Sequence, residues 1–393
     1  MKKVLFLIAL FGFELFALNL DEVISQALEK NPSLESITQR IEANKYSQDI
    51  SNQFANPVLS FSTDTLDASE KMHKQTLKVQ QKIAFYGKRD SKLAISKAEQ
   101  DILDTSLTRA KVNLVNEIKN QAYNIWELEQ LLSIVAQYEN LTKQNIELSE
   151  SYTSTSQNQH MGIMSAQLSL TDLQIQRSTL KSKIYSAYTK LSYLASFEID
   201  KIDLDISLES KMPSIESLKS GLVNNVDLKV KDKEIAKNQA MIKSAEVNNY
   251  PDINLVAGYS LRQNYDDYLT VGFGLSLPIY GTEDAKEEKQ RTLILASQSQ
   301  KKDVDFKVNS EFMSVYMQMK SEYEIYHIIH DEAMPQIEHM FELSNSSIST
   351  GGDFFKYIDI LKQKLKLEQK IIASIANYNR ANAKISALRG ELK

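Results

Sequence analysis

The chain has 393 residues, a formal net charge of −5, 42% apolar residues and no cysteine. The acidic balance argues against a nucleic-acid partner, and the absence of thiols excludes disulfides, thiolate metal sites and an N-terminal lipidated cysteine. With only 11 glycines and 6 prolines, the sequence has few turns and predicts long helices.

A tandem repeat organises the chain. Residues 20–200 align with residues 214–393 at a constant offset of 194, without a gap. One architecture built twice is therefore expected, with a first repeat at 18–200, a linker at 201–213 and a second repeat at 214–393. Matched positions include Asn31 with Asn225, Pro57 with Pro251, Tyr86-Gly87 with Tyr280-Gly281, and Lys190 with Lys384.

The first residues have the pattern of an export signal. Lys2 and Lys3 precede an apolar run from Val4 to Phe16, and Ala17 comes before a polar, helix-like stretch. This pattern predicts a secretory signal peptide over residues 1–17. No later run approaches the ~18 apolar residues that a membrane-spanning helix needs.

Each repeat is predicted to begin with a broken helix and to end with two very long ones. The first helix runs from Leu20 to Phe54 with a break at Asn31-Pro32, and its counterpart runs from Ser214 to Asn249 with a break at Asn224-Asn225. A helix of about 65 residues would be roughly 95 Å long. The long helices are expected at 88–153, 160–197, 283–346 and 353–392, joined by polar breaks at 151–159 and 344–353. A coiled-coil seam is predicted at Leu114, Ile118, Ile125, Leu128, Leu132 and Val135.

Strict alternation between the helices predicts four strands, at 57–65, 75–86, 251–262 and 267–280. They form two hairpins, across the loops Asp64–Lys74 and Arg262–Asp266, and Pro57 and Pro251 each open a strand. A half-buried soluble sheet would alternate in the same way. Export, strand lengths of about 9 to 11 residues and aromatic residues near the strand ends favour a membrane barrel instead. Since the smallest closed membrane barrels have eight strands, three copies giving twelve strands are expected. The aromatic residues near the strand ends are Phe85, Tyr259, Tyr268 and Tyr280.

The segment QQKIAFYGKR (80–89) ends the second strand, and GGDFFKYIDILKQKLKLEQK (351–370) forms a turn followed by a helix. Together with the tandem repeat and its two strands per repeat, these segments resemble the TolC-type outer-membrane efflux family. The first is similar to the motif Q-x-I-P-x-x-G-K-R of the heavy-metal branch. Ala84 stands where that motif has proline, whereas the second repeat has Pro278 at the equivalent place. The matching residues are Gln80 (or Gln81), Ile83, Gly87, Lys88 and Arg89.

The resemblance implies a mainly α fold with membrane β structure. The expected assembly is a homotrimer in which a 12-stranded outer-membrane β-barrel continues into a long α-helical barrel across the periplasm. It also implies a passive exit duct that works with a periplasmic adaptor and an inner-membrane resistance-nodulation-division (RND) pump, without a cofactor. Heavy-metal cations are the leading hypothesis for the exported substrate. Multidrug efflux and type I secretion are alternatives within this architecture, and a periplasmic coiled-coil or adaptor protein is the alternative of another class.

The resemblance also implies a periplasmic gate with an acidic ring after the second polar break. Asp359 occupies the matching place, and Lys356 stands one turn earlier, where some relatives carry a second acid. Asp353 is another candidate, although an aspartate directly before a helix usually caps it. Lys88 and Arg89 oppose the dipole of the helix that they begin, so we expect them to serve packing or an interface.

No catalytic arrangement is predicted, because the five histidines do not accompany a nucleophile motif and no phosphate-binding glycine loop occurs. His327 and His330 share a helix face and could supply two metal ligands, although a solvated face is the commoner role. His160, Met161 and Met164 near the first polar break could offer soft ligands, although methionines in long helices usually fill the seam.

Overall fold

The computed structural model describes residues 18–64, 73–84, 86–151, 157–348 and 353–392. The predicted signal peptide, most of the first hairpin loop, Phe85 and parts of both polar breaks lie outside these residues. The chain forms two compact units. Unit 1 contains residues up to Leu34, Ala110–Val223 and Asn309–Lys393, and unit 2 contains Glu35–Arg109 and Asn224–Val308.

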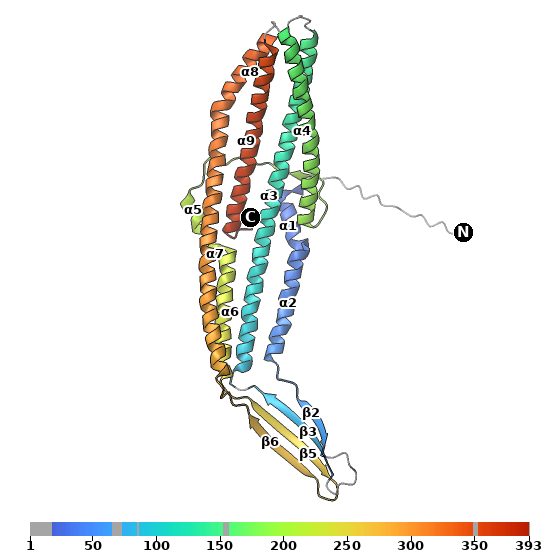
Figure 1. Ribbon diagram of the computed structural model, residues 1–393, viewed down its shortest axis with the longest axis vertical. Helices are drawn as coiled ribbons and strands as arrows, with labels where there is room; N and C mark the ends of the chain where they lie inside the picture. The colour runs from blue at the N-terminus through green and yellow to red at the C-terminus, as the bar shows by residue number, and fades with distance from the viewer. Residues whose placement is uncertain (1–17, 65–72, 85, 152–156, 349–352, 393) are drawn as a thin grey trace, which may run out of the picture. The chain divides into compact units, whose positions relative to one another are not determined.

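Unit 2 contains a four-stranded antiparallel sheet (Figure 1). Its strands are β2 (Val58–Thr63), β3 (Lys74–Ile83), β5 (Ile253–Arg262) and β6 (Tyr268–Leu275), in the order β2-β3-β5-β6. Both predicted hairpins are present, and the β3–β5 pair joins the two repeats over ten matched residues, with Leu77 opposite Tyr259.

The sheet has one apolar and one polar face. Directly opposed residues of an antiparallel pair point to the same side, so the register defines both faces. The apolar face is exposed, with Val271 and Phe273 at 76% and 77% of their full accessibility. It contains Leu59, Phe61, Leu77, Val79, Leu255, Leu269, Val271, Phe273 and Leu275. The polar face contains Ser60, Ser62, Thr76, Lys78, Gln80, Asn254, Gly258, Ser260, Thr270, Gly272 and Gly274, together with Val58, Val256 and Tyr268.

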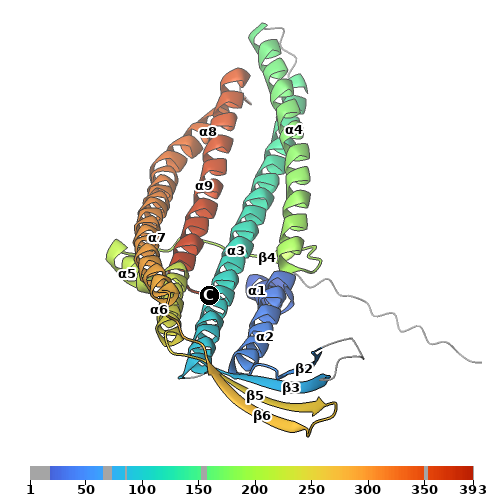
Figure 2. The same ribbon diagram turned by 60° about the horizontal axis from the view of Figure 1, so that its bottom comes forward.

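The helices of unit 2 connect to the strands at one end of the sheet (Figure 2). They are α2 (Pro32–Asn52), the first part of α3 (Lys88–Ser151), α6 (Val226–Asn248) and the first part of α7 (Thr282–His327). Gly87 and Gly281, which directly precede α3 and α7, have φ values of +69° and +68°. Because L residues disfavour this left-handed conformation, the repeated Tyr-Gly pairs are explained as two equivalent strand-to-helix turns.

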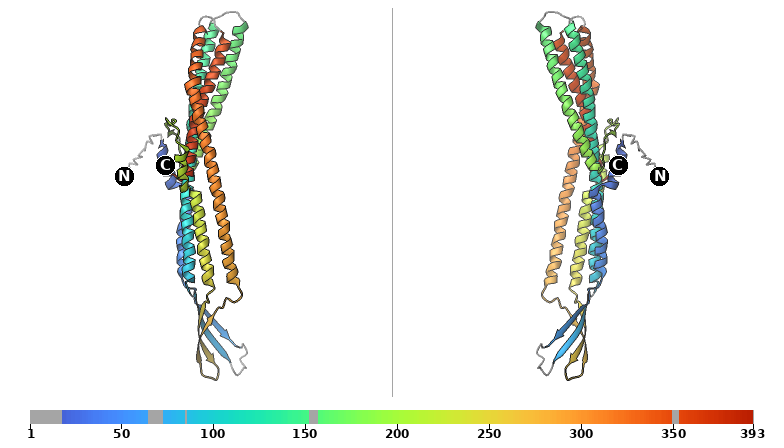
Figure 3. Two further views of the ribbon diagram at one scale, coloured as in Figure 1. Left: turned by 90° about the vertical axis from the view of Figure 1, so that its left-hand side faces the viewer. Right: turned by 90° about the vertical axis from the view of Figure 1, so that its right-hand side faces the viewer.

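Unit 1 is built from α1 (Leu20–Lys30), the rest of α3 and α7, α4 (Gln157–Ala195), α5 (Ile215–Lys219), a 3₁₀ turn (Ser220–Asn224), α8 (Met334–Ile348) and α9 (Phe354–Leu388). Helix α9 lies beside both α8 and α4 (Figure 3). A short parallel bridge joins β1 (Leu18–Asn19) to β4 (Ile202–Asp203).

The core of unit 1 follows the predicted seam of α3. Ile118, Ile125 and Val135 are each fully buried. The first two pack with residues of α1 and α4, whereas Val135 packs with a second cluster that includes Phe354, Tyr357 and Ile358 of α9. The seam prediction is therefore confirmed at these positions.

Strands β2 and β3 end at Thr63 and Ile83, two and three residues earlier than predicted, and three larger differences follow. Strand β6 ends at Leu275 rather than at 280, and Pro278, which cannot donate to a ladder, follows shortly after. The predicted helix 283–346 is interrupted by a π-helical turn, η2 (Ile328–Ala333), where Met334 N–H donates to Ile329 O five residues back. Pro335 follows directly, and its ring excludes a regular α turn. The β1–β4 bridge was not predicted.

Within the described residues, no helix is both long and apolar enough to span a bilayer.

Candidate functional site

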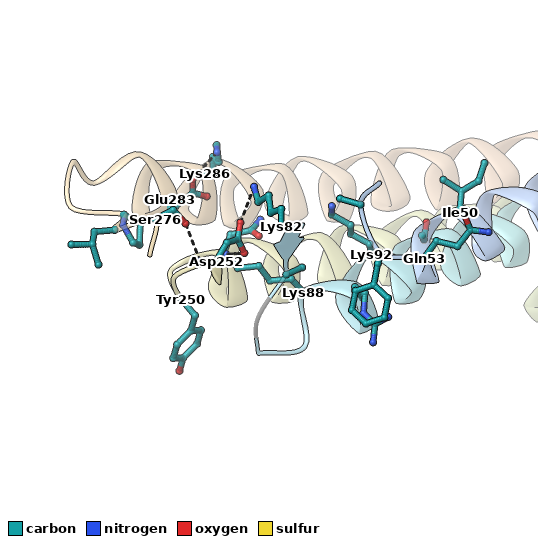
Figure 4. Close-up of a pocket in the computed structure, with 18 residues that line it drawn as sticks. Ile50, Gln53, Lys82, Lys88, Lys92, Tyr250, Asp252, Ser276, Glu283 and Lys286 are labelled. Atoms are coloured by element: carbon teal, nitrogen blue, oxygen red, sulfur yellow. Dashed lines mark hydrogen bonds and ion pairs between the residues drawn. The ribbon is translucent and has the colours of Figure 1, made fainter. Parts of the chain in front are cut away.

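The basic residues of the 80–89 motif lie at the strand-to-helix junction of unit 2 (Figure 4). The side chain of Lys88, at the start of α3, is 9% exposed, and its Nζ lies 2.9 Å from Oδ1 of Asp252. Lys82, near the end of β3, places its Nζ 3.0 Å from Oδ2 of the same carboxylate. The ion pair Lys88–Asp252 therefore joins the first repeat to the second.

Asp252 is held from several sides. Its backbone N–H donates to Ser276 Oγ at 2.9 Å, and its carbonyl accepts from Ser276 N–H at 3.0 Å. Burial raises the pKa of the Asp252 carboxyl, but hydrogen bonds from Lys88 and Lys82 and their positive charges outweigh burial, so the pKa lies below its usual value. The carboxylate is thus ionised at neutral pH and links β3 to α3, while the backbone of Asp252 joins the segment after β6.

Arg89 contacts the end of α2. Its Nη1 donates to Asn52 O at 3.2 Å, and its guanidinium carbon lies 4.0 Å from the centre of the Phe54 ring. A cation at the last carbonyls of a helix complements the dipole of that helix. Lys88 and Arg89 therefore contact neighbouring elements, and neither stabilises the helix that it begins.

The other motif residues shape the same junction. Gln81 Nε2 donates to Ala55 O at 2.7 Å, while Gln80 lies on the polar face opposite Val58 and Val256. Ile83 ends β3 opposite Ile253, and Gly87 forms the left-handed turn into α3.

A cavity of about 710 Å³ opens at this junction. Five cationic and two acidic side chains line it, together with apolar groups that include Phe54, Leu277 and Pro278. The charged residues are Lys82, Lys88, Arg89, Lys92, Lys286, Asp252 and Glu283. A cavity with this excess of positive charge attracts anions rather than metal cations.

The gate candidates Asp353, Lys356 and Asp359 lie in unit 1, at the start of α9. Asp353 is the N-cap of this helix, because its Oδ1 accepts from the backbone N–H groups of Phe355 and Lys356 at 3.0 and 3.3 Å. Lys356 and Asp359 are both exposed. The carboxylate of Asp359 accepts from Gln363 Nε2 at 2.7 Å, one turn further along the same face.

The opposite face of α9 is firmly packed. Tyr357 is fully buried, its hydroxyl accepts from Asn145 Nδ2 at 2.9 Å, and burial raises its pKa to about 12. Gly162 of α4 packs closely against α9, since an added Cβ would lie 3.2 Å from the Phe354 ring and from Phe355 N, which is tighter than an ordinary contact. This packing fixes which face of α9 presents Asp359.

The histidines do not form a metal centre in the described part of the chain, where no group of three or more His, Asp or Glu side chains is placed to hold an ion. His327 and His330 direct their Nδ1 atoms at the two oxygens of Asp331, at 2.8 and 2.7 Å. Hydrogen bonds from His330 and His327 lower the pKa of that carboxyl. In α4, Met161 and Met164, which follow the exposed His160, are 57% and 52% exposed rather than buried as seam residues.

Asp252 was missed by reasoning from the sequence. The sequence does contain a signal for the Lys88–Asp252 pair, because the two repeats differ in residue type at both positions. Asp252 aligns with Val58, and Lys88 aligns with Thr282. Two departures of opposite charge, one in each repeat, are what a contact between the repeats would produce.

No protein-family model and no curated protein matches the chain. Several solved structures do. CusC superposes with a TM-score of 0.80 at 12% identity, over 95% of this chain and 92% of that chain. The outer membrane protein VceC of Vibrio cholerae gives 0.77 at 14% identity, over 95% and 97%. The open state of the MtrE outer membrane channel of Neisseria gonorrhoeae gives 0.80 at 12% identity, over 95% and 89%. The chain therefore has the fold of these outer membrane proteins, with long helical hairpins and four antiparallel strands.

Proposed function

We propose that the protein is the outer-membrane channel of a tripartite efflux system, a passive and non-enzymatic exit duct of the TolC type. The observation that carries this proposal is the four-stranded sheet. One face carries large exposed apolar side chains, and the other carries mostly small and polar ones. The exposed apolar face is suited to contact with lipid, and the polar face is suited to line a water-filled lumen.

The sheet also supports assembly into a homotrimer. Within the described residues, β2 and β6 each have a strand on one side only, so both outer edges are open for pairing. Four strands per chain cannot close a barrel, whereas twelve can. We propose that the barrel lies in the outer membrane and that the long helices extend into the periplasm toward an adaptor and an inner-membrane RND pump.

The proposed substrate class is heavy-metal cations, supported by the match of Gln80, Ile83, Gly87, Lys88 and Arg89 to the motif of that branch. Drug efflux and type I secretion use the same architecture. The junction contacts of Lys88 and Arg89 serve all three, because they maintain the fold rather than select a substrate.

We expect the detergent-solubilised protein to be a trimer, because open sheet edges and an apolar face require partners. The mass of the purified particle, corrected for bound detergent, checks this. Heat-modifiable migration in gels reports a folded barrel. A monodisperse monomer that needs no detergent would contradict the channel and favour the periplasmic coiled-coil or adaptor class.

We further propose that Asp359 lines the periplasmic constriction, and Asp359→Asn is expected to reduce cation selectivity and weaken block by multivalent cations. Three carboxylates around an axis raise cation occupancy in a narrow pore. The exposed position of Asp359, on the face of α9 opposite the buried Tyr357, supports this role. Reversal potential and single-channel conductance in planar bilayers are the measurements.

Lys356→Ala is the companion variant and is expected to act in the opposite direction if its side chain shares the pore with Asp359. Asp353→Asn serves as a control, because the side chain of Asp353 is engaged in capping α9. Unchanged selectivity and unchanged cation block in Asp359→Asn would remove this residue from the gate.

A further inference from the structure

All the charged residues of the four strands are basic, and all lie on the polar face. The strands contain three lysines, one arginine and neither aspartate nor glutamate. Lys74 lies opposite Arg262, Lys78 lies between Ser60 and Gly258, and Lys82 lies opposite Asn254. Alternation places Lys74, Lys78 and Lys82 in one column along β3, about 13 Å between successive members.

The ends of this column are partly neutralised. Lys74 Nζ lies 4.0 Å from Asp64 Oδ2, and Lys82 is paired with Asp252. The Arg262 guanidinium donates to an uncharged group, the backbone carbonyl of Asp266. The strand residues of the polar face therefore carry positive charge only, and the acidic groups Asp64, Asp252, Asp266 and Asp267 lie at its two ends.

Lys78, at the centre of the column, stands apart. Its side chain is exposed, and no carboxylate or other hydrogen-bond partner contacts its ammonium group within the part of the chain that the structure describes. Its neighbours across the sheet are small: Ser60 on one side, and Gly258 followed by Thr270 on the other. The ammonium group of Lys78 therefore extends beyond the short side chains around it, and no group of opposite charge lies beside it in the described part of the chain.

We propose that the polar face of the sheet, centred on Lys78, forms an anion-selective section of the duct. This inference rests on the proposed function, in which the polar face lines the lumen. Three copies of Lys78 would then form a ring of positive charge at one level of the barrel, which favours anions and repels cations. The basic cavity at the junction, with Lys92 and Arg89, continues the same charge toward the helices.

The chemical class that this section takes is therefore small, multivalent anions, and not free metal cations. The heavy metal proposed above as the substrate would therefore cross this section in a complex of net negative charge, because a free metal cation would meet the ring as a barrier. The strand section and the proposed Asp359 constriction would thus carry opposite selectivities.

The test uses the full-length protein in planar lipid bilayers, with a KCl gradient and citrate as the multivalent anion. We expect wild type to be blocked by citrate added on the side of the strand loops. Lys78→Gln should raise the citrate concentration for half block by about threefold or more and should lower the chloride-to-potassium permeability ratio. Lys78→Arg keeps the charge and should behave as wild type, while Lys78→Glu should change both quantities further than Lys78→Gln.

Each outcome bears on a different claim. Lys78 is exposed and lies between Ser60 and Gly258, so glutamine, arginine and glutamate should each be tolerated there, and heat-modifiable migration checks that each variant is folded. Equal citrate block and equal permeability ratio in wild type, Lys78→Gln and Lys78→Glu would overturn the anion-selective section and leave the duct intact. Absence of any conductance from folded wild type would overturn the duct itself.

Discussion

Lys88→Met is expected to destabilise unit 2 by about 3 kcal/mol, at the lower end of the cost of breaking a buried ion pair. The methionine keeps most of the aliphatic stem of Lys88 but removes the ammonium group 2.9 Å from Asp252. The largely buried carboxylate would then keep only Lys82 as a charged partner. Loss of the heat-modifiable folded band at a lower temperature than in wild type is the measurement.

Lys82→Met is the matched control, since the side chain of Lys82 is 56% exposed and contacts the same carboxylate. Solvent screens this pair, so its loss should cost less than about 1 kcal/mol. The double variant Lys88→Met/Asp252→Asn should be more stable than the sum of its single changes predicts, because no unpaired charge remains. Equal melting of Lys88→Met and Lys82→Met would show that burial does not strengthen the Lys88 contact.

The same ion pair predicts a dependence on pH. Because the pKa of Asp252 in the folded chain lies below the ordinary value of 3.8, its contribution to stability is present above that value and is lost as the pH falls through the lower, folded-state pKa. Wild type should therefore lose stability in this acidic range more steeply than the Asp252→Asn variant, when the folded fraction of each is followed in gels. Parallel loss in both would show that Asp252 is not the titrating group.

The repeat made most of the fold predictable. A constant offset between two halves fixes how many strands and long helices must exist, and alternation along Leu269, Val271 and Phe273 identifies which side of the sheet is apolar. These are local signals that depend on periodicity alone. A local signal also identified the cap at Asp353, because capping depends on a few neighbouring residues.

What the sequence did not predict depends on contacts between distant segments. The pair Lys88–Asp252 spans the two repeats and forms only when β3 and β5 lie side by side. The π turn before Pro335 was not predicted, because the effect of a proline within a long helix depends on how the preceding turn re-forms its hydrogen bonds. The end of β6 at Leu275 was overestimated because apolar alternation continues through Leu277 and Ile279 beyond the paired residues.

The second large effect is expected on the apolar face of the sheet. Phe273→Arg should cost about 2 to 4 kcal/mol if the face contacts lipid near the bilayer midplane, because a guanidinium group there loses its hydration. Phe273 is 77% exposed in the isolated chain, so the change removes little packing within one copy. In a soluble sheet the same substitution on an exposed residue would be nearly neutral. The size of the effect therefore distinguishes a lipid-facing surface from a water-facing one.

Gly272→Arg provides the matched control, since it introduces the same charge one residue away on the opposite face. An added Cβ at Gly272 meets no atom within 4 Å, and its backbone does not adopt a left-handed conformation. Its arginine would project into the lumen, where water remains available, and the folded yield should stay close to that of wild type. The yield of heat-modifiable protein after refolding into lipid vesicles compares the two variants directly. A high yield for Phe273→Arg together with a low yield for Gly272→Arg would mean that the two faces are inverted, and the lysine column of β3 would then face lipid, which its charge makes untenable for a stable barrel.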